Sequence, residues 1–595
     1  MKKYIIRGLL IIIILASICG LGYYFYYQFY MPNNDVVVAF QTDRTNLVIE
    51  DKIIIAKNPP MIVDEEILLP IEIIREYIDK DIFWDDNLKK VTITTKNRVI
   101  RMKTDELEAF VNNNPVNLNI PAKENNGTVY IPIEFLSEFY GIDIRHEEEN
   151  NVVILDPTSS MIQIAKPINS KAVIRTGRSI KEPIIREYDF LNIEENVEYD
   201  PHDENSNSTG TGENISLISS QDTNLISSYI DIQELDDNVL RIFKEYDNWY
   251  KVRTKDGVIG YIEKKFVVVE WIFIKNRFSL MESEVIPWKP EKGRINLVWE
   301  MMYSVRPNLQ QIGKIEGLDV ISPTWFQVED DQGNIINRSD ATYVEWAHQN
   351  GYKIWALFSN DFQDIDATSR FLNNTDARDN AIRQILTYAS LYKLDGINID
   401  FENIYKEDKD ALTQFVREIT PLLREQGLVV SIDVNIPGGS DTWSKCYDHK
   451  ALGEIVDYVM LMTYDQHWAG SPVAGSVAQL SWVENNLVKV LELVPREKLL
   501  LGLPFYIRLW QEEAVAGTVK VTNPSVLTMK GAREVVNKYD ATVEWDEESG
   551  QFYAEYEKDG KTYKMWIEDE NSINLKSSLV HKYKLAGTAA WKRSD

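Results

Sequence analysis

The stretch DGINIDFE, residues 395–402, places the polar residues Asn398, Asp400 and Glu402 at every second position of an otherwise apolar run. Side chains of a β-strand alternate between its two faces, so these three residues share one face and the apolar ones share the other. The next segment has apolar residues at helical spacing, namely Leu412, Phe415, Val416, Ile419 and Leu423. A buried strand that leads into an amphipathic helix is typical of a parallel α/β fold.

Seven more apolar runs accompany this one in the C-terminal half of the chain. They are INLVWEMM (295–302), LDVISPTWF (318–326), KIWALFSN (353–360), LVVSIDVNIP (428–437), VDYVMLMTYD (456–465), KLLLGLPFY (498–506) and GTAAW (587–591). Eight such strands alternating with helices predict a (β/α)8 TIM barrel over residues 290–595. Residues 511–580 are too many for one helix and contain an Asp559-Gly560 turn. We expect a small α+β insertion there, which forms one wall of a cleft.

The polar face of residues 395–402 predicts the chemistry of the barrel. In such barrels the reactive groups lie at the carboxyl ends of the strands. Repulsion between Asp400 and Glu402, with partial burial, is expected to raise one pKa and keep a proton available near neutrality. Glu402 is nearer the mouth and is the predicted acid; the alternative is a surface pair of acids after a strand. Asp395 breaks the alternation, so we expect it to have a structural role near the barrel floor.

Three motifs resemble those of family 18 glycoside hydrolases. Residues 395–402 resemble the family motif Asp-Gly-x-Asp-x-Asp-x-Glu, and residues 462–465 (Met-Thr-Tyr-Asp) resemble its Met-x-Tyr-Asp on strand six. Trp591 closes the last strand, where the family has a Trp under the bound sugar. The resemblance covers about half of the chain. The order of modules is similar to that of bacterial cell-wall and spore-cortex glucosaminidases.

The resemblance implies a retaining, substrate-assisted cleavage of β-1,4 bonds in glycans that contain N-acetylglucosamine. Glu402 would protonate the glycosidic oxygen, Asp400 would hold the acetamido N–H, and Tyr464 would bind the acetamido oxygen. The other residues that the resemblance assigns are the supporting Asn398, Asp395 and Asp465, and the substrate-binding Trp591, Met462, Tyr506 and Ser359. It implies no cofactor.

Two departures from the family pattern affect this expectation. Asn398 stands where the family has its middle Asp; it can hydrogen-bond Asp400 but cannot share a proton with it. Strand three reads Phe-Ser-Asn-Asp at 358–361, without the glycines usual in chitinases. Peptidoglycan is the favoured substrate. A chitinase, a chitooligosaccharide hydrolase and a non-catalytic lectin on the same barrel remain alternatives, although such lectins typically lose the acid that Glu402 provides.

The N-terminus predicts a membrane anchor. Lys2, Lys3 and Arg7 precede residues 8–27, which carry no charge. About 20 apolar residues span a bilayer core, and an aromatic cluster from Tyr23 follows as an interfacial belt. Residues 1–34 are therefore interpreted as a cytoplasmic tip and single-pass anchor in a bacterial cell membrane, with the rest outside the cytoplasm. A cleaved signal peptide is the alternative.

Residues 35–160 contain a repeat. The stretch LLPIEIIREYIDK begins at Leu68 and VYIPIEFLSEFYG begins at Val129, and an offset of 62 residues aligns Pro70 with Pro132. Each copy reads as a strand, an amphipathic helix and two short strands. The repeat resembles the N-terminal domain of copper amine oxidases. Since His146 is its one histidine and no ligand set accompanies it, we predict no copper site but a spacer or wall-facing role.

Residues 163–268 read as short alternating strands with turns. NWYKVRTKDGVIGYIEKKFV, which begins at Asn248, resembles bacterial SH3-like domains. The resemblance implies binding of cell-wall peptides, and a rigid spacer is the alternative. Residues 191–226 are rich in Asn, Ser, Glu, Asp and Gly and are predicted to be a disordered insertion.

Composition narrows the classes of partner. The 595-residue chain has a formal net charge of -28, which repels phosphate backbones and argues against nucleic-acid binding. Its two cysteines, Cys19 and Cys446, provide no disulfide framework or thiolate zinc site. The six histidines show no i, i+4 spacing, so the sequence predicts no metal.

Overall fold

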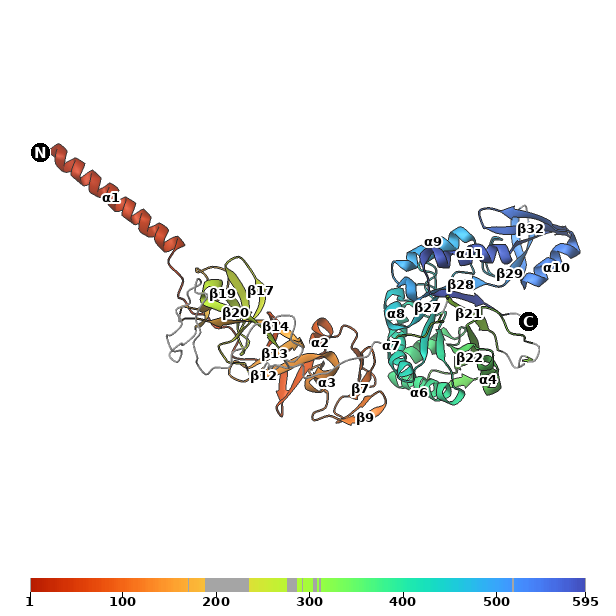
Figure 1. Ribbon diagram of the computed structural model, residues 1–595, viewed down its shortest axis with the longest axis horizontal. Helices are drawn as coiled ribbons and strands as arrows, with labels where there is room; N and C mark the ends of the chain where they lie inside the picture. The colour runs from red at the N-terminus through yellow and green to blue at the C-terminus, as the bar shows by residue number, and fades with distance from the viewer. Residues whose placement is uncertain are drawn as a thin grey trace, which may run out of the picture. The chain divides into compact units, whose positions relative to one another are not determined.

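The computed structural model describes residues 2–169, 171–187, 235–274, 286–291, 293–302, 308–309, 312–515 and 518–593. The predicted insertion at 191–226 lies outside these residues. The chain forms two compact units, one of residues 1–80 with 118–281 and one of residues 81–117 with 282–595 (Figure 1).

The first unit begins with helix α1 (Lys2–Phe29). Its segment Gly8–Phe29 is long and apolar enough to cross a membrane, a property that signal sequences share. After the helix, the backbone N–H of Asn33 donates to the Ile180 carbonyl at 2.8 Å, and Arg175 Nη1 donates to the Asn33 carbonyl at 2.6 Å. These bonds attach the segment after α1 to the strand-rich region at 161–273.

The two sequence repeats each contain a strand and a helix, β4 (Glu66–Pro70) with α2 (Ile71–Tyr77) and β11 (Thr128–Pro132) with α3 (Ile133–Tyr140). β4 and β11 pair antiparallel in the four-stranded sheet β10-β11-β4-β3, with β3 at Met61–Val63 and β10 at Lys123–Asn125. A second sheet has the order β12-β13-β1-β2, and its strands are β1 (Asn46–Ile49), β2 (Lys52–Ile54), β12 (Ile142–Glu147) and β13 (Val152–Pro157).

The following region forms one seven-stranded antiparallel sheet with the order β16-β15-β19-β18-β17-β14-β20. Its strands are β14 (Met161–Pro167), β15 (Val173–Arg175), β16 (Ile184–Glu187), β17 (Leu240–Glu245), β18 (Trp249–Arg253), β19 (Ile259–Glu263) and β20 (Val267–Phe273). Asp156 at the end of β13 forms a buried ion pair of 2.5 Å with Arg253, which links this sheet to the repeats.

The second unit contains a closed barrel of eight parallel strands, which confirms the predicted fold class. The strands are β21 (Ile295–Glu300), β22 (Val320–Val328), β24 (Lys353–Ser359), β25 (Gly396–Asp400), β26 (Val429–Asn435), β27 (Tyr458–Met462), β28 (Leu499–Pro504) and β34 (Gly587–Trp591). β21 pairs with both β22 and β34, and these two pairings close the barrel. A short strand β23 (Ile335–Asn337) pairs antiparallel with β22.

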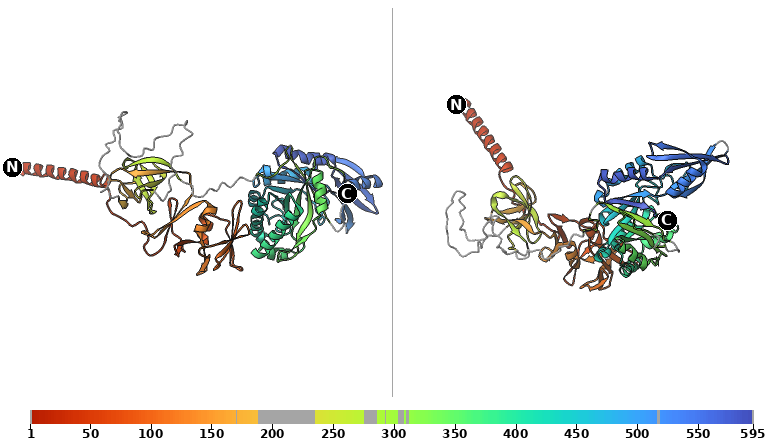
Figure 2. Two further views of the ribbon diagram at one scale, coloured as in Figure 1. Left: turned by 60° about the horizontal axis from the view of Figure 1, so that its bottom comes forward. Right: turned by 45° about the vertical axis from the view of Figure 1, so that its right-hand side comes forward.

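Helices cover the outside of the barrel (Figures 1 and 2). They are α4 (Ala341–Gln349), α5 (Ile365–Leu372), α6 (Thr375–Tyr392), α7 (Lys409–Glu425), α8 (His449–Ile455), α9 (Leu480–Leu491) and α11 (Glu570–Tyr583). Ile397, Ile399 and Phe401 pack in the apolar layer between strands and helices, together with Phe415 and Ile419 of α7. The period-2 alternation of β25 is therefore present as expected.

An α+β insertion stands between β28 and α11, as the sequence predicted. Its strands are β29 (Ile507–Val515), β30 (Thr518–Leu527), β31 (Thr542–Asp546), β32 (Gln551–Lys558) and β33 (Lys561–Ile567), and its helix is α10 (Met529–Tyr539). The strands form one antiparallel sheet in the order β30-β29-β33-β32-β31. The Asp559-Gly560 turn joins β32 to β33.

A five-stranded sheet from the first repeat belongs to the barrel unit. It consists of β5 (Phe83–Asp85), β6 (Lys90–Thr94), β7 (Val99–Lys103), β8 (Glu108–Val111) and β9 (Asn114–Asn117). Arg101 of β7 pairs with Glu418 of α7 at 3.3 Å, and Glu418 pairs with Arg378 of α6 at 2.9 Å. The sequence grouped all of residues 35–160 in one region. Within that region, this sheet packs with the barrel, where Arg101 meets a partner 317 residues away along the chain.

Candidate active site

A cleft of about 1250 Å³ opens at the carboxyl ends of the barrel strands. Five carboxylates, five of its aromatic residues and two arginines characterise its lining: Asp361, Asp400, Glu402, Asp433, Asp465, Trp299, Trp443, Trp468, Trp591, Tyr464, Arg338 and Arg508. Carboxylates beside aromatic rings suit a carbohydrate ligand, because rings pack on sugar faces and carboxylates bind hydroxyl groups.

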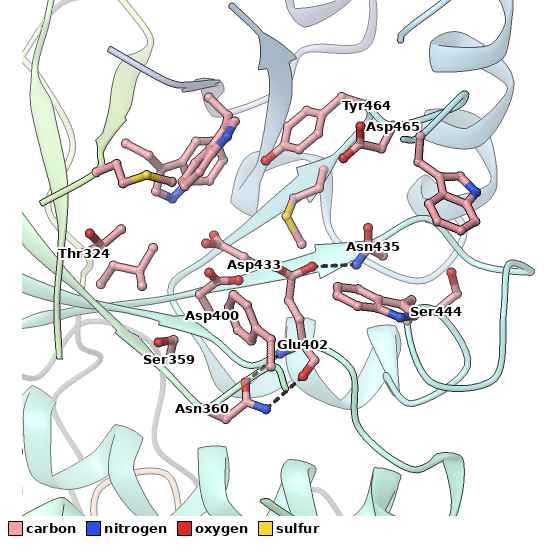
Figure 3. Close-up of a pocket in the computed structure, with 18 of the residues that line it drawn as sticks. Thr324, Ser359, Asn360, Asp400, Glu402, Asp433, Asn435, Ser444, Tyr464 and Asp465 are labelled. Atoms are coloured by element: carbon pink, nitrogen blue, oxygen red, sulfur yellow. Dashed lines mark hydrogen bonds between the residues drawn. The ribbon is translucent and has the colours of Figure 1, made fainter. Parts of the chain in front are cut away.

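Glu402 stands just beyond β25, where two asparagines hold it (Figure 3). The Asn360 side chain accepts from the Glu402 backbone N–H at 2.9 Å and donates to the Glu402 carbonyl at 2.8 Å. Asn435 Nδ2 donates to Glu402 Oε2 at 3.2 Å. Burial raises the pKa of Glu402 to about 7; the Asn435 hydrogen bond opposes this shift and the Asp465 charge adds to it. Glu402 therefore exchanges a proton near neutrality.

Asp400 lies beneath Glu402 and is 7% exposed. Its Oδ1 is buried and has no hydrogen-bond partner among the described residues. Burial raises the pKa of Asp400 well above its usual value, and the charges of Glu402 and Asp433 raise it further. A buried polar oxygen without a partner is costly, so its presence at the floor of a cleft indicates a place for a donor from a ligand.

The sequence suggested a hydrogen bond between Asn398 and Asp400, but the Asn398 side chain has other partners. Its Nδ2 donates to Asp433 Oδ2 at 2.7 Å, and its Oδ1 accepts from Ser431 Oγ at 2.7 Å. The reason is the strand register, which sets Asn398 opposite Ser431 on β26. The Asn398 amide therefore faces β26 and contacts a third buried carboxyl, that of Asp433. Burial raises the pKa of Asp433 well above its usual value.

Tyr464 and Asp465 follow β27 and both line the cleft. In Figure 3 the Tyr464 hydroxyl points into the cleft. Asp465 Oδ1 accepts from Tyr506 Oη at 2.7 Å and from Arg508 Nη2 at 2.9 Å. Tyr506 is thus placed to hold Asp465, and the residues that line the cleft do not include it.

The remaining predicted residues divide into two groups. Ser359, Met462 and Trp591 line the cleft with the carboxylates. Asp395 precedes β25, at the opposite end of that strand from Glu402. There its carboxylate accepts from Lys353 Nζ at 2.7 Å and from the Ile354 backbone N–H at 2.9 Å, and pairs with His348 Nε2 at 2.8 Å.

Several cleft residues were missed from the sequence. Asp433 and Asn435 line the cleft, and with the buried Ser431 they occupy alternate positions of β26, a pattern like that of residues 398–402 that could have revealed them. Asn360 carries no comparable signal, because its role depends on reaching Glu402 from the next strand. From the insertion, Arg508 is the described residue that lines the cleft, and Trp443 and Trp468 come from the loops after β26 and β27.

The described residues contain no group of three or more His, Cys, Asp or Glu side chains arranged to hold a metal ion.

Two family models match the chain: "Glycosyl hydrolases family 18" over residues 311–595 and "Copper amine oxidase N-terminal domain" over residues 48–155.

Three curated relatives match part of the chain. "Uncharacterized glycosylase YvbX" of Bacillus subtilis is 29% identical over 272 residues, which cover 44% of this chain and 76% of that protein. The "Cortical fragment-lytic enzyme" of Bacillus subtilis is 28% identical over 37% of this chain and 51% of its own length. Human "Di-N-acetylchitobiase" is 25% identical over 35% of this chain and 60% of its own length. Residues 311–595 are therefore similar to the family 18 glycoside hydrolases, and residues 48–155 to the copper amine oxidase N-terminal domain.

Proposed function

We propose that this protein cleaves β-1,4 bonds of peptidoglycan, next to N-acetylglucosamine, by a retaining mechanism in which the substrate's acetamido group takes part. The observation that carries this proposal is the pairing of Glu402, whose pKa is about 7, with Asp400, whose buried Oδ1 has no partner among the described residues. One group can give up a proton near neutral pH, and the other can accept a hydrogen bond from a ligand.

In the first step the Glu402 carboxyl gives its proton to the glycosidic oxygen, and the bond from that oxygen to the anomeric carbon breaks. The acetamido carbonyl oxygen of the same sugar forms a new bond to that carbon, which gives an oxazolinium ion. Asp400 Oδ1 accepts the acetamido N–H and stabilises the positive charge. The Tyr464 hydroxyl donates to the acetamido oxygen, and Trp591 packs under the sugar.

In the second step the Glu402 carboxylate takes a proton from water. The water oxygen bonds to the anomeric carbon from the side that the leaving group vacated, and the oxazolinium ring opens. Two displacements at one carbon retain its configuration. No carboxylate nucleophile is needed, because the acetamido oxygen forms the bond to the anomeric carbon.

Peptidoglycan is favoured over chitin because of the relatives and the other modules. The relatives include enzymes named for cortical fragment lysis. Helix α1 would anchor the protein in the bacterial cell membrane, with the barrel outside the cytoplasm. The repeats and the seven-stranded sheet would contact the wall or serve as spacers. A chitinase or a glycan-binding lectin is the alternative function of the same cleft.

The experiment is to incubate the full chain in detergent with purified peptidoglycan and, separately, with colloidal chitin. New reducing ends are measured by mass spectrometry, with Glu402→Gln as the matched inactive variant. Reducing N-acetylglucosamine ends from peptidoglycan that require Glu402 support the proposal. Cleavage of chitin alone identifies a chitinase, and binding without cleavage by both proteins identifies a lectin.

A further inference from the structure

We propose that Arg338, on the rim of the cleft, is a specificity-determining residue that binds a carboxylate of the glycan. This inference rests on the proposed function, because it concerns the substrate of the same cleft. It begins from the charges of the cleft lining, in which Arg338 and Arg508 are the cations among the described residues.

The two arginines differ in their partners. Arg508 forms an ion pair of 2.9 Å with Asp465, so its charge is balanced within the protein. Arg338 forms no ion pair with any residue that the structure describes; its side chain donates from Nη2 to Gln327 Oε1 at 3.0 Å. A guanidinium carries five N–H donors in a planar fork that matches a carboxylate. Most of this fork is available to a ligand in the cleft.

Arg338 is held in position although its side chain is exposed. Its backbone N–H donates to the Trp325 carbonyl at 2.9 Å, and Gln327, which also lines the cleft, fixes one end of the guanidinium. In a chain with a net charge of -28, an unpaired cation at a cleft is a local attraction for anions that the rest of the surface repels.

The strand register places this cation beside the reacting sugar and not on it. Gln327 of β22 lies opposite Ser359 of β24, and Ser359 lies opposite Asp400 of β25. Two strand spacings of roughly 4.8 Å separate Gln327 from Asp400 by about 10 Å. A carboxylate on Arg338 therefore belongs to a neighbour of the sugar whose acetamido group meets Asp400.

The opposite side of the cleft has a different chemistry. Beyond β25 in the sheet order, Trp443 and Trp468 are 42% and 59% exposed and line the cleft. Exposed indole rings suit a neutral sugar face. A polymer of neutral N-acetylglucosamine alone would leave Arg338 unpaired. A glycan that also carries carboxylates, on the lactyl ether of muramic acid or on a stem peptide, would engage both sides.

The test compares kcat/KM of the full chain on three soluble substrates. These are glycan strands that retain their stem peptides, strands whose peptides an amidase has removed so that the lactyl carboxylates are free, and neutral chitooligosaccharides. The variants are Arg338→Gln and Arg338→Glu. The control is Arg496→Ala, an exposed arginine in the turn before β28, at the amino-terminal end of that strand.

The quantity compared is the ratio of kcat/KM on carboxylated strands to kcat/KM on chitooligosaccharides. We expect Arg338→Gln to lower this ratio about fivefold, because a charged hydrogen bond is lost. Arg338→Glu should lower it further, because the new carboxylate repels that of the substrate. Added salt should reduce the ratio of the wild type more than that of Arg338→Gln. The carboxylated substrate that shows the loss identifies the source of the carboxylate. An unchanged ratio in both variants, with an active wild type, overturns the inference alone. A wild type that cleaves only chitooligosaccharides overturns the proposed peptidoglycan function as well.

Discussion

The hydrogen bond from Asn435 to Glu402 lowers the pH at which the Glu402 carboxyl loses its proton. The bond stabilises the carboxylate, so it lowers the pKa of Glu402 against the larger effect of burial. A hydrogen bond to a charged group contributes roughly 1.5–3 kcal/mol, and its length of 3.2 Å places it at the weak end of that range. Loss of about 1.4 kcal/mol corresponds to about one pKa unit. Asn435→Ala should therefore raise the pKa of Glu402 from about 7 to about 8.

The assay is the pH profile of kcat/KM, which reports the pKa of the free enzyme's acid. Activity requires protonated Glu402, so it falls as the pH rises through that pKa. In Asn435→Ala this alkaline limb should move up by about one unit, and Asn435→Asp should move it further by adding a like charge. Gln466→Ala is the matched control, because Gln466 lines the cleft but bonds with Gln479. An alkaline limb that stays in place or moves to lower pH would refute the reasoning.

Three other substitutions test the site and its support. Asp400→Asn should lower kcat by about 10²-fold or more with a small change in KM, since the carboxyl that can become negative where positive charge develops is replaced by an amide that cannot; an equal rise in KM in steady-state assays would contradict this. Glu402→Gln should stabilise the barrel by up to about 3 kcal/mol at pH 8.5 and not at pH 4. The folded pKa of about 7 lies above the unfolded value, so the ionised carboxylate lowers the stability of the wild type as the pH rises from the unfolded to the folded pKa. A thermal midpoint raised equally at both pH values would be inconsistent with this prediction. Glu418→Gln should destabilise the barrel by about 3–5 kcal/mol in a denaturant titration, since it leaves the buried Arg378 cation without its carboxylate and Arg101 with Asp379 alone. Loss of the exposed Lys445–Asp441 pair should cost under about 1 kcal/mol.

Local patterns predicted the parts of the fold that depend on neighbouring residues. Near-continuous apolar runs identified all eight barrel strands, because a parallel sheet covered on both faces excludes polar residues from its strands. A length too great for one helix, with the Asp559-Gly560 turn, identified the insertion. The sequence did not predict that residues 81–117 belong to the barrel unit, since the Arg101–Glu418 and Arg101–Asp379 pairs join segments that no local pattern connects.

The sequence by itself determined that Asp400 and Glu402 lie on one face of a strand that ends at the cleft, since side-chain alternation is a property of a single strand. Only the tertiary structure decided what surrounds them. The register between β25 and β26 directed Asn398 to Asp433 and away from Asp400, and the adjacent strands brought Asn360 and Asn435 to Glu402. The pKa of a carboxyl depends on burial and on charges from the whole barrel, and these are fixed only when distant segments pack together.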